Sequence, residues 1–335
     1  MNIRNKYNAI DVMKLFMAFL VVGIHVGSSF DTLYPVGVCF ILEMAVPFFF
    51  VCSGFFIQNK IEKTGNCMIV LKQSCKRYLK LYLLWHIVYF PIALRFIFAS
   101  NHDIFDNFLY CLRRFLFVGE YFYSWPLWYL HGLIVSIIFV FMLYRCRLSL
   151  VQIWIISVLM MLIGYFVKNI AKYQFDISIK EVCQSLIYLL GSADRNGPFR
   201  GFALVCTGMM IQKYSSFIRH RYALGILCIT TSYILYINNL PYYLLFSGFG
   251  IFIIASSIFL KDNPCYFSFR IHSTLIYFIH MYFVVFTHML LKETIISVIN
   301  VYLIWIAVSF FTWIISILIN KLRKKEKYLW INNFI

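Results

Sequence analysis

The sequence predicts an all-α, polytopic integral membrane protein, and its composition and its apolar runs both indicate this class. Hydrophobic residues make up 62% of the chain, aromatic residues 20% and charged residues only 13%. About a quarter of the residues are charged in an ordinary soluble domain. Apolar runs recur along the chain, and many approach the roughly 20 residues that a helix needs to cross a bilayer. A transmembrane barrel would instead show alternating segments of about ten residues.

The apolar runs predict ten membrane-spanning helices in one domain that covers residues 1–335. The predicted spans are 10–30, 36–57, 78–99, 126–144, 150–167, 197–212, 222–238, 242–260, 274–291 and 295–319. The first span is not expected to be a removable signal peptide, because Asp11 and Lys14 interrupt its start. Gly27 to Phe30 is also a poor match to a cleavage site.

The basic residues predict that both termini lie in the cytoplasm. With the N-terminus inside, the inside segments hold 20 of the 30 Lys and Arg, and the outside segments hold 7. This asymmetry follows the positive-inside rule. An even number of spans returns the basic tail, residues 320–335, to the cytoplasm. The net charge of +17 is thus a topology signal and an attraction to anionic membrane lipids. Nucleic acid is not an expected partner, because the charge is scattered over separate loops.

The predicted outer segments and the cysteines offer no further enzyme signature. An apolar run, 108–117, predicts an interfacial helix on the outer leaflet, and the aromatic run 121–125 is typical of a membrane-interface belt rather than a substrate platform. No C-x-x-C pair occurs, so we expect no metal site. Cys111 and Cys183 are the cysteines predicted outside, and whether they pair stays open. No phosphate-binding G-x-x-x-x-G-K-[ST] loop is present, which counts against ATP-driven work.

Lys14 and His25 lie eleven residues apart within the first predicted span. At the rise of an α-helix, eleven steps give about 16 Å and almost three whole turns. Both side chains therefore project from one helix face, one near each end. Ionisable groups inside a membrane helix are costly, so the pair indicates a functional site. The structural alternative is a snorkelling lysine and a histidine bonded to a nearby carbonyl.

The second predicted span supplies two further candidates, Glu43 and Ser53. Glu43 is expected at a depth similar to that of His25, where a carboxylate would orient the imidazole and raise its basicity. Ser53 precedes Gly54, and such a pair lets another helix or a ligand approach closely. We predict Glu43 as a catalytic partner of His25 and Ser53 as a candidate oxyanion donor.

A basic motif, 76–80, opens the third predicted span on the cytoplasmic side. Arg77 and Lys80 share a helix face at the level of Lys14. Three cations at one level predict a site for phosphate groups, and anionic lipid is the competing occupant.

Together, these residues resemble the acyltransferase 3 family, the bacterial membrane O-acyltransferases of surface polysaccharides and related glycans. The matching segments are Lys14 with His25, Val46 to Phe55, and Arg77 to Lys80; weaker matches are Leu127 to Leu130, Arg195 to Phe199 leading to Gly208, and Ile276 to His280. The resemblance runs over most of the chain. Lysine replaces the commoner arginine at positions 14 and 80, which keeps charge but loses bidentate geometry. The Glu43–His25 pairing is not part of the family pattern.

The resemblance implies an acyl donor on the cytoplasmic side, acetyl-CoA or another acyl-CoA, with no permanently bound cofactor. It implies a glycan or lipid-linked glycan acceptor outside, and a place in the bacterial cytoplasmic membrane. Lys14, Arg77 and Lys80 would then bind the donor, and His25 would act as general base. An acyl-histidine intermediate stays open. The rival interpretations are a carrier for a lipid-linked sugar or an amphipathic anion, and a scaffold without catalysis.

Overall fold

The computed structural model describes the chain from residue 7 to residue 335 with five internal gaps. The gaps are 32–33, 100–102, 173–176, 192–196 and 292–299. Every regular element in the described part is a helix, which confirms the predicted all-α class. The α-helices are α1 (Asn8–Ser29), α2 (Val36–Glu43), α3 (Ala45–Thr64), α4 (Cys67–Ala99), α5 (Ile104–Arg113), α6 (Trp128–Arg145), α7 (Leu150–Lys168), α8 (Ile177–Leu190), α9 (Phe202–Lys213), α10 (Arg221–Ile237), α11 (Tyr243–Ser257), α12 (Pro264–Leu290) and α14 (Val301–Leu322).

Seven stretches of the described chain are long and apolar enough to cross a membrane. They are α1, α2 with α3, α4, 125–145, α7, α12 and α14. Large apolar side chains cover their outward faces, and Ile87, Phe98 and Ile306 are each more than 60% exposed. Such a surface would associate in water, whereas in a bilayer it faces lipid. The chain is therefore a multi-pass membrane protein.

Three of the ten predicted spans form shorter helices. The span 197–212 becomes a π-helical turn, η5 (Gly197–Gly201), followed by the twelve residues of α9; α10 has 17 residues and α11 has 15. The start of the last predicted span, 295–299, lies outside the described residues, and its helix continues as α14. Ten spans and cytoplasmic termini stay predictions.

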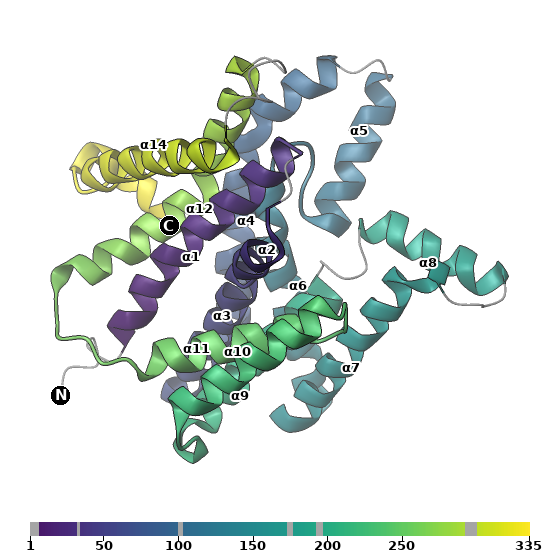
Figure 1. The fold of residues 1–335 in the computed structure, drawn as a ribbon, viewed down its shortest axis with the longest axis vertical. Coiled ribbons are helices and arrows are strands. Elements are labelled where there is room, and N and C mark those ends of the chain that lie inside the picture. Colours follow the sequence, from purple (N-terminus) through teal and green to yellow (C-terminus); the bar gives the residue numbers. More distant parts are fainter. Residues whose placement is uncertain (1–6, 32–33, 100–102, 173–176, 192–196, 292–299) are drawn as a thin grey trace.

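The second predicted span is two helices rather than one. α2 ends at Glu43 and α3 begins at Ala45, so the direction of the chain changes at Met44. In Figure 1, α2 is seen nearly end-on, whereas α3 runs downward. Pro47 lies in the first turn of α3, where its missing N–H breaks no helical hydrogen bond. Pro47 in this predicted span therefore lies at a helix start.

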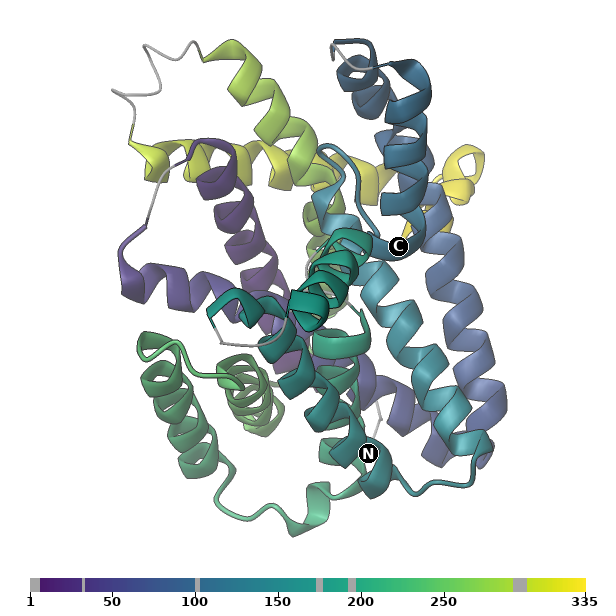
Figure 2. The same ribbon diagram turned by 90° about the vertical axis from the view of Figure 1, so that its right-hand side faces the viewer.

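Close helix crossings hold the core together. α3 crosses α9 where Gly54 faces the Val205 carbonyl and Gly208 faces the Val51 carbonyl, with no room for a side chain on either glycine. The close approach predicted from the Ser-Gly pair is thus confirmed, and α9 is the partner. α1 runs along α12 (Figure 1), and Figure 2 shows α4 and α6 side by side.

The basic C-terminal segment returns to the helix bundle. After α14 it forms η7 (Glu326–Phe334), a 3₁₀ segment that contacts α4. Lys80 Nζ donates to Asn333 Oδ1 at 2.8 Å, and Trp85 Nε1 donates to the Phe334 carbonyl at 3.2 Å. The predicted tail is therefore docked on the helix that carries the basic motif. The thiols of Cys111 and Cys183 are both free.

Cysteine accessibility tests the predicted orientation. Single cysteines at Lys72 and Lys324 should react with an impermeant thiol reagent only after the cytoplasmic face is opened, because the basic asymmetry places both inside. A cysteine at Asp106, in α5, should react in intact cells. If the cysteine at position 72 reacts in intact cells, the predicted orientation is the wrong way round. A donor would then enter from the opposite side.

Candidate active site

One unbroken helix, α1, carries both Lys14 and His25. No proline or glycine kink interrupts the 22 residues from Asn8 to Ser29, so the spacing of about 16 Å along one face applies. Lys14 is mostly buried, with 16% of its side chain exposed. His25 is half-buried four residues before the end of the helix. The helix therefore presents a cation and an imidazole at different depths.

The imidazole of His25 lies between two aromatic rings from distant parts of the chain. The His280 ring of α12 stacks on it at 5.1 Å between centroids, and the Trp125 ring of η3 (Trp125–Leu127) lies at 5.7 Å. Trp125 belongs to the aromatic run that the sequence assigned to a membrane belt. The structure brings this ring to His25, because the turn before α6 packs against α12.

His280 is the side chain that sequence reasoning left without a role. It is fully buried, and its Nδ1 lies 3.0 Å from the carbonyl oxygen of Ile276. A carbonyl only accepts, so Nδ1 carries the proton in the neutral ring and Nε2 presents its lone pair. Nε2 is buried without a hydrogen-bond partner among the described residues. The signal in the sequence was a histidine inside a predicted span.

Glu43 lies at the end of α2 and faces α11. Its carboxylate accepts a hydrogen bond from the Tyr243 hydroxyl, and Tyr236 of α10 is close enough to interact with its charge. The contacts described for His25 are with Trp125 and His280. The two side chains thus have different described partners, and the catalytic role of Glu43 stays a prediction.

Ser53 belongs to a row of hydroxyl groups that joins three helices. Tyr78 of α4 lies close to Ser53, and Ser53 Oγ lies 2.9 Å from the Tyr129 hydroxyl of α6. Tyr129 in turn donates to the Phe49 carbonyl at 3.2 Å. Because Tyr129 has a single proton, Ser53 donates to Tyr129 in this arrangement. Ser53 would have to leave Tyr129 before it could serve an oxyanion, and its catalytic role stays a prediction.

Lys14 is held near the N-terminal end of α1 by an acidic and an aromatic side chain. Its Nζ lies 3.8 Å from Asp11 Oδ1 and 4.6 Å from the centre of the Phe56 ring. Asp11 is buried and also accepts two hydrogen bonds from Arg270 of α12, at 3.1 and 2.7 Å. This fork-like pair joins α1 to α12, the helix that carries His280.

Arg77 and Lys80 lie on the exposed side of α4. Arg77 is near enough to Lys60 of α3 for the two charges to repel, and Lys80 bonds to Asn333. α1 and α4 both pack on α3. The structure therefore arranges the three predicted donor-binding cations around one helix, Lys14 buried and the other two exposed.

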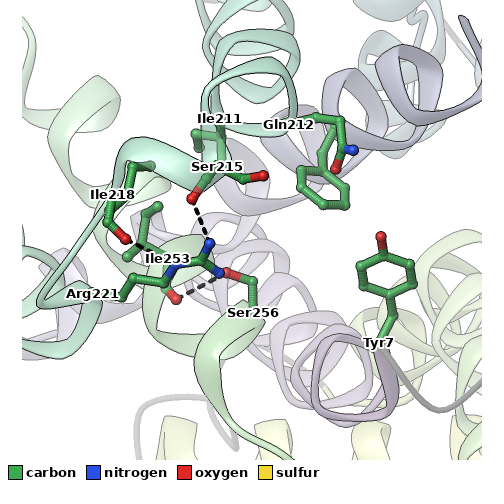
Figure 3. A pocket seen from close by; sticks show the side chains of 9 residues that line it. Tyr7, Ile211, Gln212, Ser215, Ile218, Arg221, Ile253 and Ser256 are labelled. Atoms are coloured by element: carbon green, nitrogen blue, oxygen red, sulfur yellow. Dashed lines mark hydrogen bonds between the residues drawn. The ribbon is translucent and has the colours of Figure 1, made fainter. Parts of the chain in front are cut away.

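A small cavity lies beside the N-terminal end of α1 (Figure 3). Tyr7, Phe55, Gln212 and Arg221 are among its lining residues, and its volume is about 50 Å³. The Arg221 guanidinium donates to the backbone carbonyl of Ser215 at 2.6 Å. Burial raises the pKa of Tyr7, so its hydroxyl stays neutral. The space suits a few water molecules and is too small for a nucleotide.

The fold and the site define a class of protein. It is a multi-pass helical membrane protein with a buried cation on α1 and a pair of histidines, one on α1 and one on α12. Residues 7–321 match the model of a protein family described as an acyltransferase domain. The chain therefore belongs to the acyltransferase 3 family and is a membrane acyltransferase, as its sequence motifs indicated. Arg195 and Asn196 of the weaker motif lie outside the described residues.

One curated relative is an amino-acid racemase of Enterococcus faecalis, 30% identical over 150 residues. The match covers 42% of this chain and 20% of the relative, so this chain spans about a fifth of that protein. The racemase name describes the longer protein. No solved structure matches this chain.

Proposed function

We propose that this acyltransferase moves an acyl group, acetyl in the simplest case, from cytoplasmic acyl-CoA to a hydroxyl of a glycan on the outer side of the bacterial cytoplasmic membrane. The observation that carries the proposal is α1 itself. One helix presents a buried cation at one level and a half-buried imidazole about 16 Å away. An extended CoA arm bridges such a distance, with its phosphates at the inner cations and its thioester at the imidazole.

His25 is the general base of the proposed reaction. Its imidazole removes the proton of the acceptor hydroxyl as the oxygen attacks the thioester carbonyl. A C–O bond forms, the C–S bond breaks, and the proton passes from His25 to the departing sulfur, so that CoA leaves as the thiol. The imidazolium that exists between these steps lies 5.7 Å from the Trp125 ring, within the range of cation–π attraction.

Lys14, Arg77 and Lys80 form the proposed donor site. Phosphate groups accept charge-assisted hydrogen bonds from such cations. The Lys14 ammonium is oriented by Asp11, and Arg270 takes up the remaining charge of that carboxylate. Lys80 is held by Asn333 of the docked C-terminal segment, so this segment is part of the donor site in the proposal.

Substitution of the three cations should weaken donor binding. We expect Lys14→Ala, Arg77→Ala and Lys80→Ala each to raise the Kd for CoA roughly 10- to 150-fold, since hydrogen bonds to charged groups contribute about 1.5–3 kcal/mol each. Isothermal titration of the purified protein measures this. Lys72→Ala, an exposed cation on the same helix, is the matched control and should bind CoA normally. Three variants with wild-type affinity would place the donor elsewhere.

Direct assay tests the function as a whole. Purified protein is incubated with radiolabelled acetyl-CoA and a panel of bacterial glycans, and label on a glycan is the expected result. A carrier would be favoured by two results together. The label would remain on CoA with every glycan tested, and the same preparation would move a lipid-linked sugar across the membrane of vesicles.

A further inference from the structure

We propose that His280, Trp125 and Tyr123 form the subsite that binds the sugar ring of the acceptor. The inference rests on the proposed function, because it assigns part of the same site to the second substrate. It starts from the unpartnered nitrogen of His280 and from a row of aromatic rings that leads away from His25.

The lone pair of His280 Nε2 requires a hydrogen-bond donor. The side chain is 0% exposed, Nδ1 is committed to the Ile276 carbonyl, and Nε2 has no partner among the described residues. A buried polar atom without a partner costs about 1–3 kcal/mol, so such atoms in native proteins usually meet a ligand or water. The ring that carries this lone pair stacks on the ring of His25, the proposed base, at 5.1 Å between centroids.

The acceptor is the reactant that best supplies that donor. A glycan carries several hydroxyl groups on neighbouring carbons. When one hydroxyl reaches His25 for attack, an adjacent one lies a few ångströms away, where it can donate to Nε2. The thioester and its acyl group carry no N–H or O–H. The nearest amide of the CoA arm is the competing donor, and the experiment below separates the two.

Aromatic rings extend the subsite away from His25. Trp125 stacks on Tyr123 at 5.3 Å, and Tyr123 lies 4.6 Å from Phe96 of α4. These three rings are partly exposed rather than sealed in the core. Phe122, the residue before Tyr123, has φ +43°, an unfavourable conformation for a side chain of this size. Backbone strain of this kind clusters at ligand sites.

The combination fits a pyranose ring. Ligand sites pair apolar and aromatic walls with a few well-placed polar groups. A sugar ring offers C–H faces to the aromatic walls and hydroxyls at its edge to the imidazole. An anionic or purely apolar acceptor would leave the lone pair unmet, since a lone pair repels an anion and an alkyl chain has nothing to donate.

Substitutions at His280 test the inference, with methyl pyranosides as acceptor probes and labelled acetyl-CoA as donor. His280→Leu should raise the acceptor KM about tenfold or more, with the donor KM unchanged. His280→Gln, whose amide oxygen can replace Nε2 as acceptor, should restore the acceptor KM to within about threefold. His288→Leu is the matched control, because His288 lies about two turns further along α12 against Phe30.

Tyr123→Leu gives a second reading if His280→Leu does not fold. It should raise the KM for methyl pyranosides severalfold and leave the KM for sorbitol, an acyclic polyol, unchanged, because only a ring presents a stacking face. If both variants still transfer the acyl group and their acceptor KM is unchanged, the proposed subsite is wrong. The same holds if the donor KM rises instead of the acceptor KM. Absence of transfer in the unsubstituted protein would overturn the proposed function itself.

Discussion

Replacement of His25 by alanine is expected to remove acyl transfer and to leave CoA binding unchanged. A positioned general base contributes about 10²- to 10⁴-fold to the rate, and in the proposed arrangement the donor phosphates bind about 16 Å from His25, at the level of Lys14. We expect kcat to fall by at least 100-fold, with a Kd for CoA within about twofold of wild type. Single-turnover transfer and calorimetric titration of the same preparation provide the two numbers.

His288→Ala is the control for this substitution. His288 lies near the end of α12 and contacts Phe30 of α1. The variant therefore shows the effect of removing an imidazole from the same pair of helices, α1 and α12, at a position away from His25. It should transfer at nearly the wild-type rate. Equal loss of CoA affinity and of transfer in His25→Ala would show that His25 has a structural role, and Trp125 and His280 would then be its packing partners.

Replacement of Gly208 by valine is expected to prevent formation of the folded protein. A methyl group at position 208 would lie 2.0 Å from the Val51 carbonyl oxygen and 2.8 Å from the Phe55 nitrogen. Both obstacles are backbone atoms, so no side-chain rotation relieves the overlap. The cost should exceed the roughly 1–3 kcal/mol of ordinary overpacking, because α3 and α9 must separate. Size-exclusion profiles and thermal melting in detergent measure the loss.

Gly37→Ala is the matched control, because nothing lies within 4 Å of a methyl group at that position. It should melt within a few degrees of wild type. A Gly208→Val protein that elutes as a single species and melts like wild type would mean that α3 and α9 do not cross this closely in the membrane.

Local features of the chain were predictable from the sequence, and contacts between distant segments were not. α1 was predicted at 10–30 and found at Asn8–Ser29, because an apolar run in a bilayer has to satisfy its backbone within one helix. The break at Met44 was missed, since hydropathy continues through it unchanged. Pro47 marked the place, but a proline fits both a kinked span and a helix start.

The same difference between local features and distant contacts applies to the candidate site. Lys14 and His25 were predictable as a pair, because their relation depends only on the geometry of one helix. The stacking of His280 and Trp125 on His25 depends on how α1, α12 and the turn before α6 pack together, and no local pattern contains that information. The pairing of Glu43 with His25 stays a prediction. It was based on depths estimated from two separate spans, and in the structure the Glu43 carboxylate, at the end of α2, accepts a hydrogen bond from Tyr243.

The most direct test of the proposed reaction is transfer across a sealed membrane. Inside-out vesicles that contain the protein, with acceptor glycan trapped in the lumen, are given labelled acetyl-CoA on the outside, which is their cytoplasmic face. We predict labelled glycan in the lumen, dependent on His25 and Lys14. Right-side-out vesicles with donor outside and glycan in the lumen should give none. Equal labelling in both orientations, or labelling only in the right-side-out vesicles, would contradict a donor that enters from the cytoplasm along α1.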